Sequence, residues 1–221
     1  MSRIVNHLLA VALMIGAAIQ PSWLCGAEPA GLFEDHGDVG VNPRKGSVEF
    51  DAAASTYKIT GGGANMWADV DAFHFVWKKI SGDVTLTADV ELLGKGAVAH
   101  RKAGVIIRQS LDANSAYADA IVHGDGSASL QYRTAAGEQT KQVESPLKGA
   151  MRLRIERRGD QFTMYAGDPQ GKLTASGPVT VKLSGAVYVG LAVCAHDAGV
   201  LETAVFSNVR MEAPPPGERS R

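Results

Sequence analysis

The stretch 84-VTLTADVEL-92 decides the fold class. Apolar side chains occupy every second position from Val84 to Leu92, and threonines and acids occupy the positions between them. Successive side chains of a β-strand point to opposite faces of the sheet, so this period of two predicts a strand with one buried and one polar face.

The same period recurs along the chain on both sides of this stretch. Residues 152–156 alternate charged and apolar side chains, and Arg158-Gly159-Asp160 then leads into Phe162 and Met164, as in a β-hairpin. Residues 187–194 and 203–211 continue the pattern. We count about ten to thirteen such segments, and no long helical period follows the N-terminal segment. The sequence therefore predicts an all-β protein with two packed antiparallel sheets.

The N-terminal segment reads as a secretion signal. Arg3 precedes the apolar run Leu8–Ile19, and Cys25-Gly26-Ala27 offers small residues for cleavage. The run is about twelve residues long, whereas a bilayer span needs roughly 20. We expect a signal peptide over residues 1–27 that is cleaved near Ala27, which gives a periplasmic or extracellular protein without a transmembrane segment in the mature chain.

Three further regions are expected in the mature chain: a lead segment over residues 28–45, the β-sandwich over 46–212 and a disordered, proline-rich tail over 213–221. Cleavage would remove one of the 22 basic residues, leaving 21 against 23 acidic ones and a net charge of −2. Nucleic-acid binders usually carry a basic surface, so we expect no nucleic-acid partner. The mature chain would keep only Cys194, which excludes an internal disulfide.

Several segments, in this order, resemble the concanavalin A-like lectin/glucanase superfamily. They are ITGGGANMWADVDAFHFVWKKISGDVTLTADVEL, HRKAGVIIRQSLDANSAYADAIVHGDG, RLRIERRGDQF and VYVGLAVCAHD. Within that superfamily the chain is similar to a poorly characterised bacterial group that is often attached to Tol-type β-propeller proteins and named after biopolymer transport components. The resemblance implies a two-sheet antiparallel jelly-roll β-sandwich whose concave face binds or cleaves carbohydrate in relatives.

The chain departs from the catalytic members of that superfamily. Their strand of alternating carboxylates, Glu-x-Asp-x-x-Glu, has no counterpart here. The chain also lacks Gly-x-Ser-x-Gly, His-Glu-x-x-His and a phosphate-binding loop. We therefore expect no catalytic residues, no metal site and no cofactor, although a spatial triad would leave no local sign.

A ligand surface is predicted from the polar faces of the strands. On the strand over 117–123, Tyr117, Asp119 and His123 share one face, which offers the ring and polar groups that sugar binding requires. Neighbouring segments add further polar side chains by the same alternation. The predicted ligand-binding residues are Tyr117, Asp119, His123, Arg108, Gln131 and Trp77. His74 and Lys78 belong to the polar sets that we expect to converge with them.

These residues also have structural interpretations. An ordinary solvated sheet face with cross-strand polar pairs gives the same pattern, and the spacing of Trp77 with Phe73 and Phe75 suggests core. Asp69 and Asp71 are more typical of a turn than of an acid pair. The run Arg152–Arg158 reads as protection of an outer or edge strand. His100, His123 and His196 lack metal-ligand spacing.

Three functions remain open at this point. The first is an exported, non-catalytic module with a carbohydrate ligand. The second is a glycan-active hydrolase with an unconventional carboxylate or histidine site. The third is a structural or interaction domain with a protein partner in the cell envelope.

Overall fold

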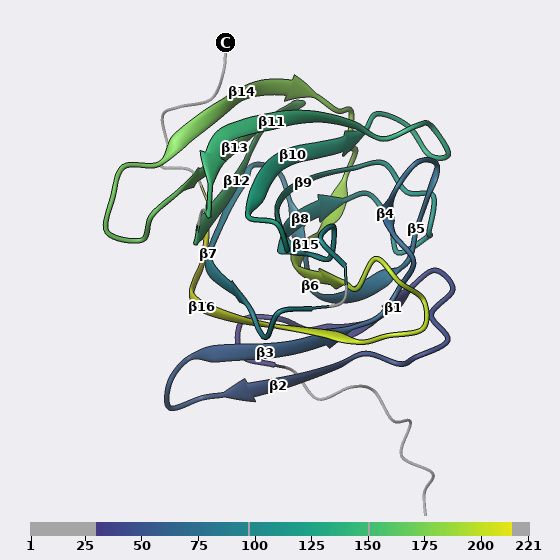
Figure 1. The fold of residues 1–221 in the computed structure, drawn as a ribbon. Helices are drawn as coiled ribbons and strands as arrows, with labels where there is room; N and C mark the ends of the chain where they lie inside the picture. Colours follow the sequence, from purple (N-terminus) through teal and green to yellow (C-terminus); the bar gives the residue numbers. More distant parts are fainter. Residues whose placement is uncertain (1–29, 97, 150, 214–221) are drawn as a thin grey trace, which may run out of the picture.

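Two seven-stranded antiparallel sheets, here called sheet A and sheet B, form the two layers of the molecule (Figure 1). The computed structural model describes residues 30–96, 98–149 and 151–213. The strands of sheet A, in spatial order, are β1 (Asp35–Val39), β6 (Phe73–Ser81), β15 (Ala186–Cys194), β8 (Lys102–Arg108), β9 (Tyr117–His123), β10 (Ser127–Arg133) and β11 (Lys141–Lys148). Those of sheet B are β14 (Thr174–Thr180), β13 (Gln161–Gly167), β12 (Arg152–Arg158), β7 (Val84–Leu92), β16 (Glu202–Glu212), β3 (Thr56–Gly61) and β2 (Ser47–Asp51).

The structure confirms the predicted all-β sandwich. Over the residues it describes, every regular element is a strand, and none is a helix long and apolar enough to cross a membrane. The alternation in β7 has the expected effect, because Val84, Leu86 and Ala88 point into the core between the sheets. Full burial of such a side chain stabilises the fold by ~1.5–3 kcal/mol for each valine or leucine.

The same alternation gives sheet A two different faces. Val105, Ala120 and Leu130 on three neighbouring strands point toward sheet B and belong to the main core. Both sheets curve in the same direction, with sheet A on the inside of the curve (Figure 1). The face of sheet A that points away from sheet B lies on the inside of this curve, and we call it the concave face. A short hairpin, β4 (Met66–Trp67) and β5 (Val70–Asp71), lies at its open side.

Details of the strands agree with the sequence in part. The predicted hairpin over 152–164 is present as β12 and β13, joined through Gly159 and Asp160. Gly159 has φ +60, a left-handed conformation that glycine adopts without strain. The lead segment contains β1, which pairs with β6, so sheet A includes a strand that precedes residue 46. The predicted signal peptide lies outside the described residues, as does all but residue 213 of the predicted tail.

The prediction that the charges of Arg152–Arg158 protect an outer or edge strand is wrong. β12 lies inside sheet B, hydrogen-bonded to β13 on one side and to β7 on the other. Its outward arginines pair with neighbouring acids instead. Arg152 binds Asp89 through two hydrogen bonds of 2.5 and 2.8 Å, and Arg158 lies 3.7 Å from Glu156. Arg157 points the other way and donates to the Leu183 carbonyl oxygen. The run is therefore a paired sheet face.

Candidate ligand-binding site

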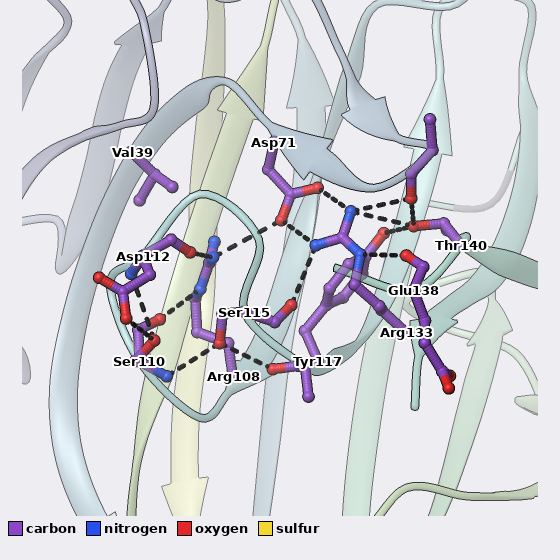
Figure 2. Close-up of polar contacts among 12 residues, drawn as sticks. Val39, Asp71, Arg108, Ser110, Asp112, Ser115, Tyr117, Arg133, Glu138 and Thr140 are labelled. Carbon is purple, nitrogen blue, oxygen red and sulfur yellow. Dashed lines mark hydrogen bonds and ion pairs between the residues drawn. The ribbon is translucent and has the colours of Figure 1, made fainter. Parts of the chain in front are cut away.

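The hairpin β4–β5 is fixed to the concave face by a buried ion-pair cluster, shown in Figure 2. The Asp71 carboxylate accepts hydrogen bonds of 2.9 and 2.8 Å from the two terminal nitrogens of Arg133. Its Oδ2 also lies 3.5 Å from Arg108 Nη2. Both guanidinium groups are fully buried. Burial raises the pKa of the Asp71 carboxyl, although the hydrogen bonds from Arg133 and the charge of Arg108 oppose the rise.

Backbone carbonyl groups complete the coordination of both arginines. Arg133 donates to Ser115 O and Glu138 O at 2.9 Å each. Arg108 donates to Ser110 O at 2.7 Å and to Asp112 O at 2.6 Å (Figure 2). The cluster thereby joins β8 and β10 to the loop over 109–116 and to the hairpin.

The tip of the hairpin is held at a second point. The turn residue Ala68 has φ +57, and its carbonyl oxygen accepts hydrogen bonds from the Thr140 amide at 2.8 Å and the Thr140 hydroxyl at 2.9 Å. Met66, at the base of the hairpin, is fully buried in a small apolar cluster with Phe73 and Phe75. Apolar packing at the base and hydrogen bonds at the tip therefore fix the position of the residue between them, Trp67.

A pocket of about 230 Å³ remains on the concave face beside the hairpin. Lys102 and His123 face each other across β8 and β9, and Gln131 follows on β10. The hairpin contributes one wall, which carries the indole ring of Trp67. The complete lining is Asn65, Trp67, His100, Lys102, His123, Gln131, Gln142 and His196.

Two buried polar groups at this pocket are incompletely hydrogen-bonded by the described residues. Gln131 Oε1 accepts no hydrogen bond from them, although the residue is only 2% exposed and lines the pocket. Lys102 Nζ donates to Asn65 Oδ1 at 2.8 Å and to Met66 O at 3.1 Å. An ammonium has three N–H donors, so one remains. A buried polar group without a partner costs about 1–3 kcal/mol, which favours a ligand that supplies the missing bonds.

Three imidazole rings gather at the rim of the pocket, although the sequence spacing did not suggest it. The ring centroid of His100 lies 6.1 Å from that of His123 and 5.6 Å from that of His196. Within the described ranges no group of histidines, cysteines and acids is arranged to hold a metal ion. Burial and then the charge of Lys102 lower the pKa of His123 to about 4, so its ring is neutral at pH 7. Its Nε2 lies 3.5 Å from Gln131 Nε2.

The predicted ligand residues share the concave face, but they differ in access. His123 and Gln131 line the pocket. Asp119 is fully buried beside it, and its Oδ1 accepts a 3.1 Å hydrogen bond from the backbone amide of Gln131. Burial raises the pKa of the Asp119 carboxyl well above its usual range, because the charge of Lys102 offsets only part of the lost hydration. Trp77 lies on the same face outside the pocket, and its ring packs on Phe75 at 5.3 Å.

Arg108 and Tyr117 have no exposed surface with which to contact a ligand. Arg108 belongs to the Asp71 cluster, and the Tyr117 hydroxyl lies 3.2 Å from Thr140 Oγ1. The prediction that Arg108 and Tyr117 contact a ligand on an open sheet face is therefore wrong. Both hold the covering hairpin and loops in place, which sequence alternation could not reveal.

The expected convergence of His74 and Lys78 with this set is also wrong. They alternate with Phe73, Phe75 and Trp77, which lie on the concave face, so they point to its opposite side. His74 is buried, and its Nδ1 lies 2.7 Å from Asp38 Oδ1. Asp69 is exposed in the turn of the β4–β5 hairpin, and Asp71 is locked between two arginines, so these acids have structural surroundings.

Two lining residues, Lys102 and Trp67, were not among the predicted ligand residues. Lys102 is on the same face of its strand as Arg108, six residues later, and the period of two could have found it. Trp67 lies in a two-residue strand that has no periodicity to read.

A second hollow continues the pocket along the edge of sheet A. It has a volume of about 320 Å³ and shares His100, His123 and Gln142 with the first. Its far side is formed by the turn after β9 and by β11, including Asp125 and Glu144. The two hollows together form a groove, which suits an extended ligand better than an isolated small molecule.

Comparison with known proteins places the fold. No protein-family model and no curated protein matches this sequence. Among solved structures, a functionally unknown protein from Saccharomyces cerevisiae is similar with a TM-score of 0.61 at 17% identity, covering 80% of this chain and 96% of that one. The carbohydrate-binding module CBM66 from Bacillus subtilis is similar with a TM-score of 0.51 at 19% identity, covering 84% and 98%.

A glycosyl hydrolase family protein from Mycobacterium fortuitum is also similar, with a TM-score of 0.50 at 11% identity, covering 83% of this chain and 95% of that one. Identities this low define the fold alone. The fold is that of the concanavalin A-like β-sandwiches, as the sequence resemblance implied.

Proposed function

We propose that this chain is a non-catalytic module that binds carbohydrate in the groove of the concave face. The observation that carries the proposal is the composition of the pocket, in which Trp67 stands beside amide, imidazole and ammonium groups. An indole ring packs on the C–H face of a sugar, and the polar groups bind its hydroxyls. The buried Gln131 Oε1, which no described residue satisfies, supplies an acceptor for a sugar hydroxyl.

The arrangement of acids favours binding over hydrolysis. Glycosidases need two carboxyl groups roughly 5–9.5 Å apart on either side of the scissile bond. The described lining of the pocket contains no acid. The nearby Asp71 is held by two arginines, and Asp119 is fully buried. In the adjoining hollow, Asp125 accepts hydrogen bonds from the Ser127 backbone amide and hydroxyl at 2.9 and 2.7 Å, and Glu144 accepts one of 2.9 Å from Gln142 Nε2. Asp71, Asp125 and Glu144 are therefore each bound by neighbouring groups of the protein, as acids in structural roles are.

We also propose export, on the basis of the N-terminal sequence, and an envelope partner, on the basis of the resemblance to domains attached to Tol-type propellers. Cell fractionation would test export: the mature chain in the periplasm or medium supports it, and an uncleaved cytoplasmic chain refutes it. Copurification of a propeller protein from cross-linked envelopes would test the second, and its absence from repeated captures would count against that partner.

A panel of soluble polysaccharides, run as affinity electrophoresis, tests carbohydrate binding. We expect retardation by at least one polymer and a loss of affinity of about tenfold or more in Trp67→Ala, as for an aromatic residue at the centre of a binding site. Trp77→Ala is the matched control, since Trp77 lies on the same face outside the pocket. Equal weakening by both variants, or no retardation by any polymer, would contradict the proposal.

A further inference from the structure

The Lys102 ammonium is a buried charge without an ion-pair partner in the described part of the chain. Lys102 is 3% exposed, and its two hydrogen-bond acceptors, Asn65 Oδ1 and Met66 O, are neutral. Buried lysines are almost always paired with an opposite charge, because the loss of hydration is otherwise uncompensated. Nζ also lies 5.8 Å from the centre of the Trp67 ring, at the wall of the pocket. This ammonium therefore stands where a bound ligand would meet it.

The other buried charges near the pocket do not balance it. Three cations lie under or beside the concave face, Arg108, Arg133 and Lys102, against two acids, Asp71 and Asp119. Asp71 is committed to the two arginines. Burial, as the largest effect, lowers the pKa of Lys102, and Asp119 opposes this fall through its charge without forming an ion pair with the ammonium. Burial also favours the neutral form of the Asp119 carboxyl.

The histidines of the lining do not supply a negative charge, since an imidazole is neutral or cationic. The Lys102 ammonium thus lacks a negatively charged partner among the described residues, and a carboxylate on the ligand would provide one.

We propose that the sugar unit bound in this pocket carries a carboxylate, so that the ligand is a uronic acid residue of an acidic polysaccharide. This inference rests on the proposed function of carbohydrate binding. The carboxylate accepts a hydrogen bond from the remaining N–H of Lys102, the sugar ring packs on Trp67, and a hydroxyl donates to Gln131 Oε1. A neutral sugar would instead remove water from the ammonium without replacing its charge partner, which is unfavourable in a buried site.

The test compares one polymer in two chemical forms. Binding of the mature chain to a polyuronate is measured by calorimetry against the same polymer after carboxyl reduction, which leaves the sugar backbone otherwise unchanged. We expect the polyuronate to bind about tenfold more tightly or better, as for a hydrogen bond to a charged group. A polysaccharide that carries sulfate esters but no carboxylates forms a third arm, because sulfate shares the anionic character of a carboxylate.

Variants of Lys102 assign the preference to this residue. Lys102→Met is expected to bind both forms equally, and Lys102→Arg to retain part of the preference. Lys58→Met, which removes a cation from the far sheet, is the control and should leave the preference unchanged. Thermal unfolding of each variant shows whether it is folded. The comparison of the two polymers on the unmodified protein holds even if Lys102→Met fails to fold.

Each result decides a different claim. Equal binding of the polyuronate and its reduced form overturns the carboxylate inference and leaves carbohydrate binding intact. Binding of the sulfated polymer alone overturns the choice of carboxylate. A preference that survives in folded Lys102→Met overturns the role of this residue. Failure of every polymer in the wider panel refutes the proposed function itself.

Discussion

Asp71→Asn should destabilise the protein, because it leaves two buried guanidinium groups without their counter-charge. Removing one partner of a buried ion pair costs about 3–5 kcal/mol. Arg108 and Arg133 keep their hydrogen bonds to backbone carbonyl groups after the substitution, so we place the loss at the lower end, about 3 kcal/mol. For a domain of this size, that loss lowers the melting temperature by roughly 6–12 °C.

The assay is urea unfolding followed by tryptophan fluorescence, with Asp69→Asn as the control. Asp69 lies two residues earlier, exposed in the turn of the same hairpin, and its substitution should change the free energy of unfolding by less than about 0.5 kcal/mol. Adding Arg108→Met to Asp71→Asn should recover part of the stability, because it removes one of the uncompensated charges.

The reasoning would be refuted if Asp71→Asn unfolded within about 0.5 kcal/mol of the unmodified protein, since that result denies any net contribution of the cluster. It would also be refuted if adding Arg108→Met to Asp71→Asn lowered the free energy of unfolding further by as much as Arg108→Met does alone. The cluster holds the wall that carries Trp67, so folded Asp71→Asn should in addition bind polysaccharide more weakly than Asp69→Asn does.

Three further predictions concern titratable groups. The pKa of His123 is about 4 in the folded protein and near 6.5 when unfolded, so its stabilisation is present above pH 6.5 and is lost as pH falls toward 4. His123→Gln should remove this part of the acid sensitivity, on the order of 3 kcal/mol, measured as the difference in unfolding free energy between pH 7 and pH 4. The same difference in the variant and the unmodified protein would disprove it. Burial alone would raise the pKa of Asp89, but hydrogen bonds from Arg152 and Asn208 outweigh it and lower the pKa, so the stabilisation by Asp89 is present above about pH 4 and is lost at lower pH. Asp89→Asn should therefore reduce the fall of the unfolding free energy in acid, and an unchanged fall would count against the Arg152–Asp89 ion pair. Burial raises the pKa of the Cys194 thiol to about 11, so in a chain without residues 1–27, where Cys194 is the remaining cysteine, a thiol reagent at pH 8 should react only after unfolding. Rapid labelling of that folded chain would contradict the structure.

The fold was predictable because its signals are local. The alternation in residues 84–92 and the turn at Gly159-Asp160 are fixed by the geometry of a strand and by the freedom of glycine, and both appear as expected. The placement of His123, Gln131 and Asp119 on the concave face was predictable in the same way, since residues two apart on a strand share a face.

The accessibility of the site was not predictable, because it depends on contacts between distant segments. Arg108 and Tyr117 are on the expected face, yet the hairpin bearing Asp71 and the loop over 109–116 cover them. The partners of Asp71 come from two different strands, and Arg133 lies 62 positions later in the chain. Trp67 belongs to a hairpin whose strands are two residues long, too short for any period to show.

The central claim is that the pocket beside Trp67 and Lys102 is a carbohydrate-binding site, and its most direct test is mapping of amide chemical shifts by NMR during titration with a polysaccharide fragment that binds. We expect shifts confined to the groove, strongest around Trp67, Lys102, His123 and Gln131. Shifts centred on sheet B, or spread evenly without saturation, would contradict it.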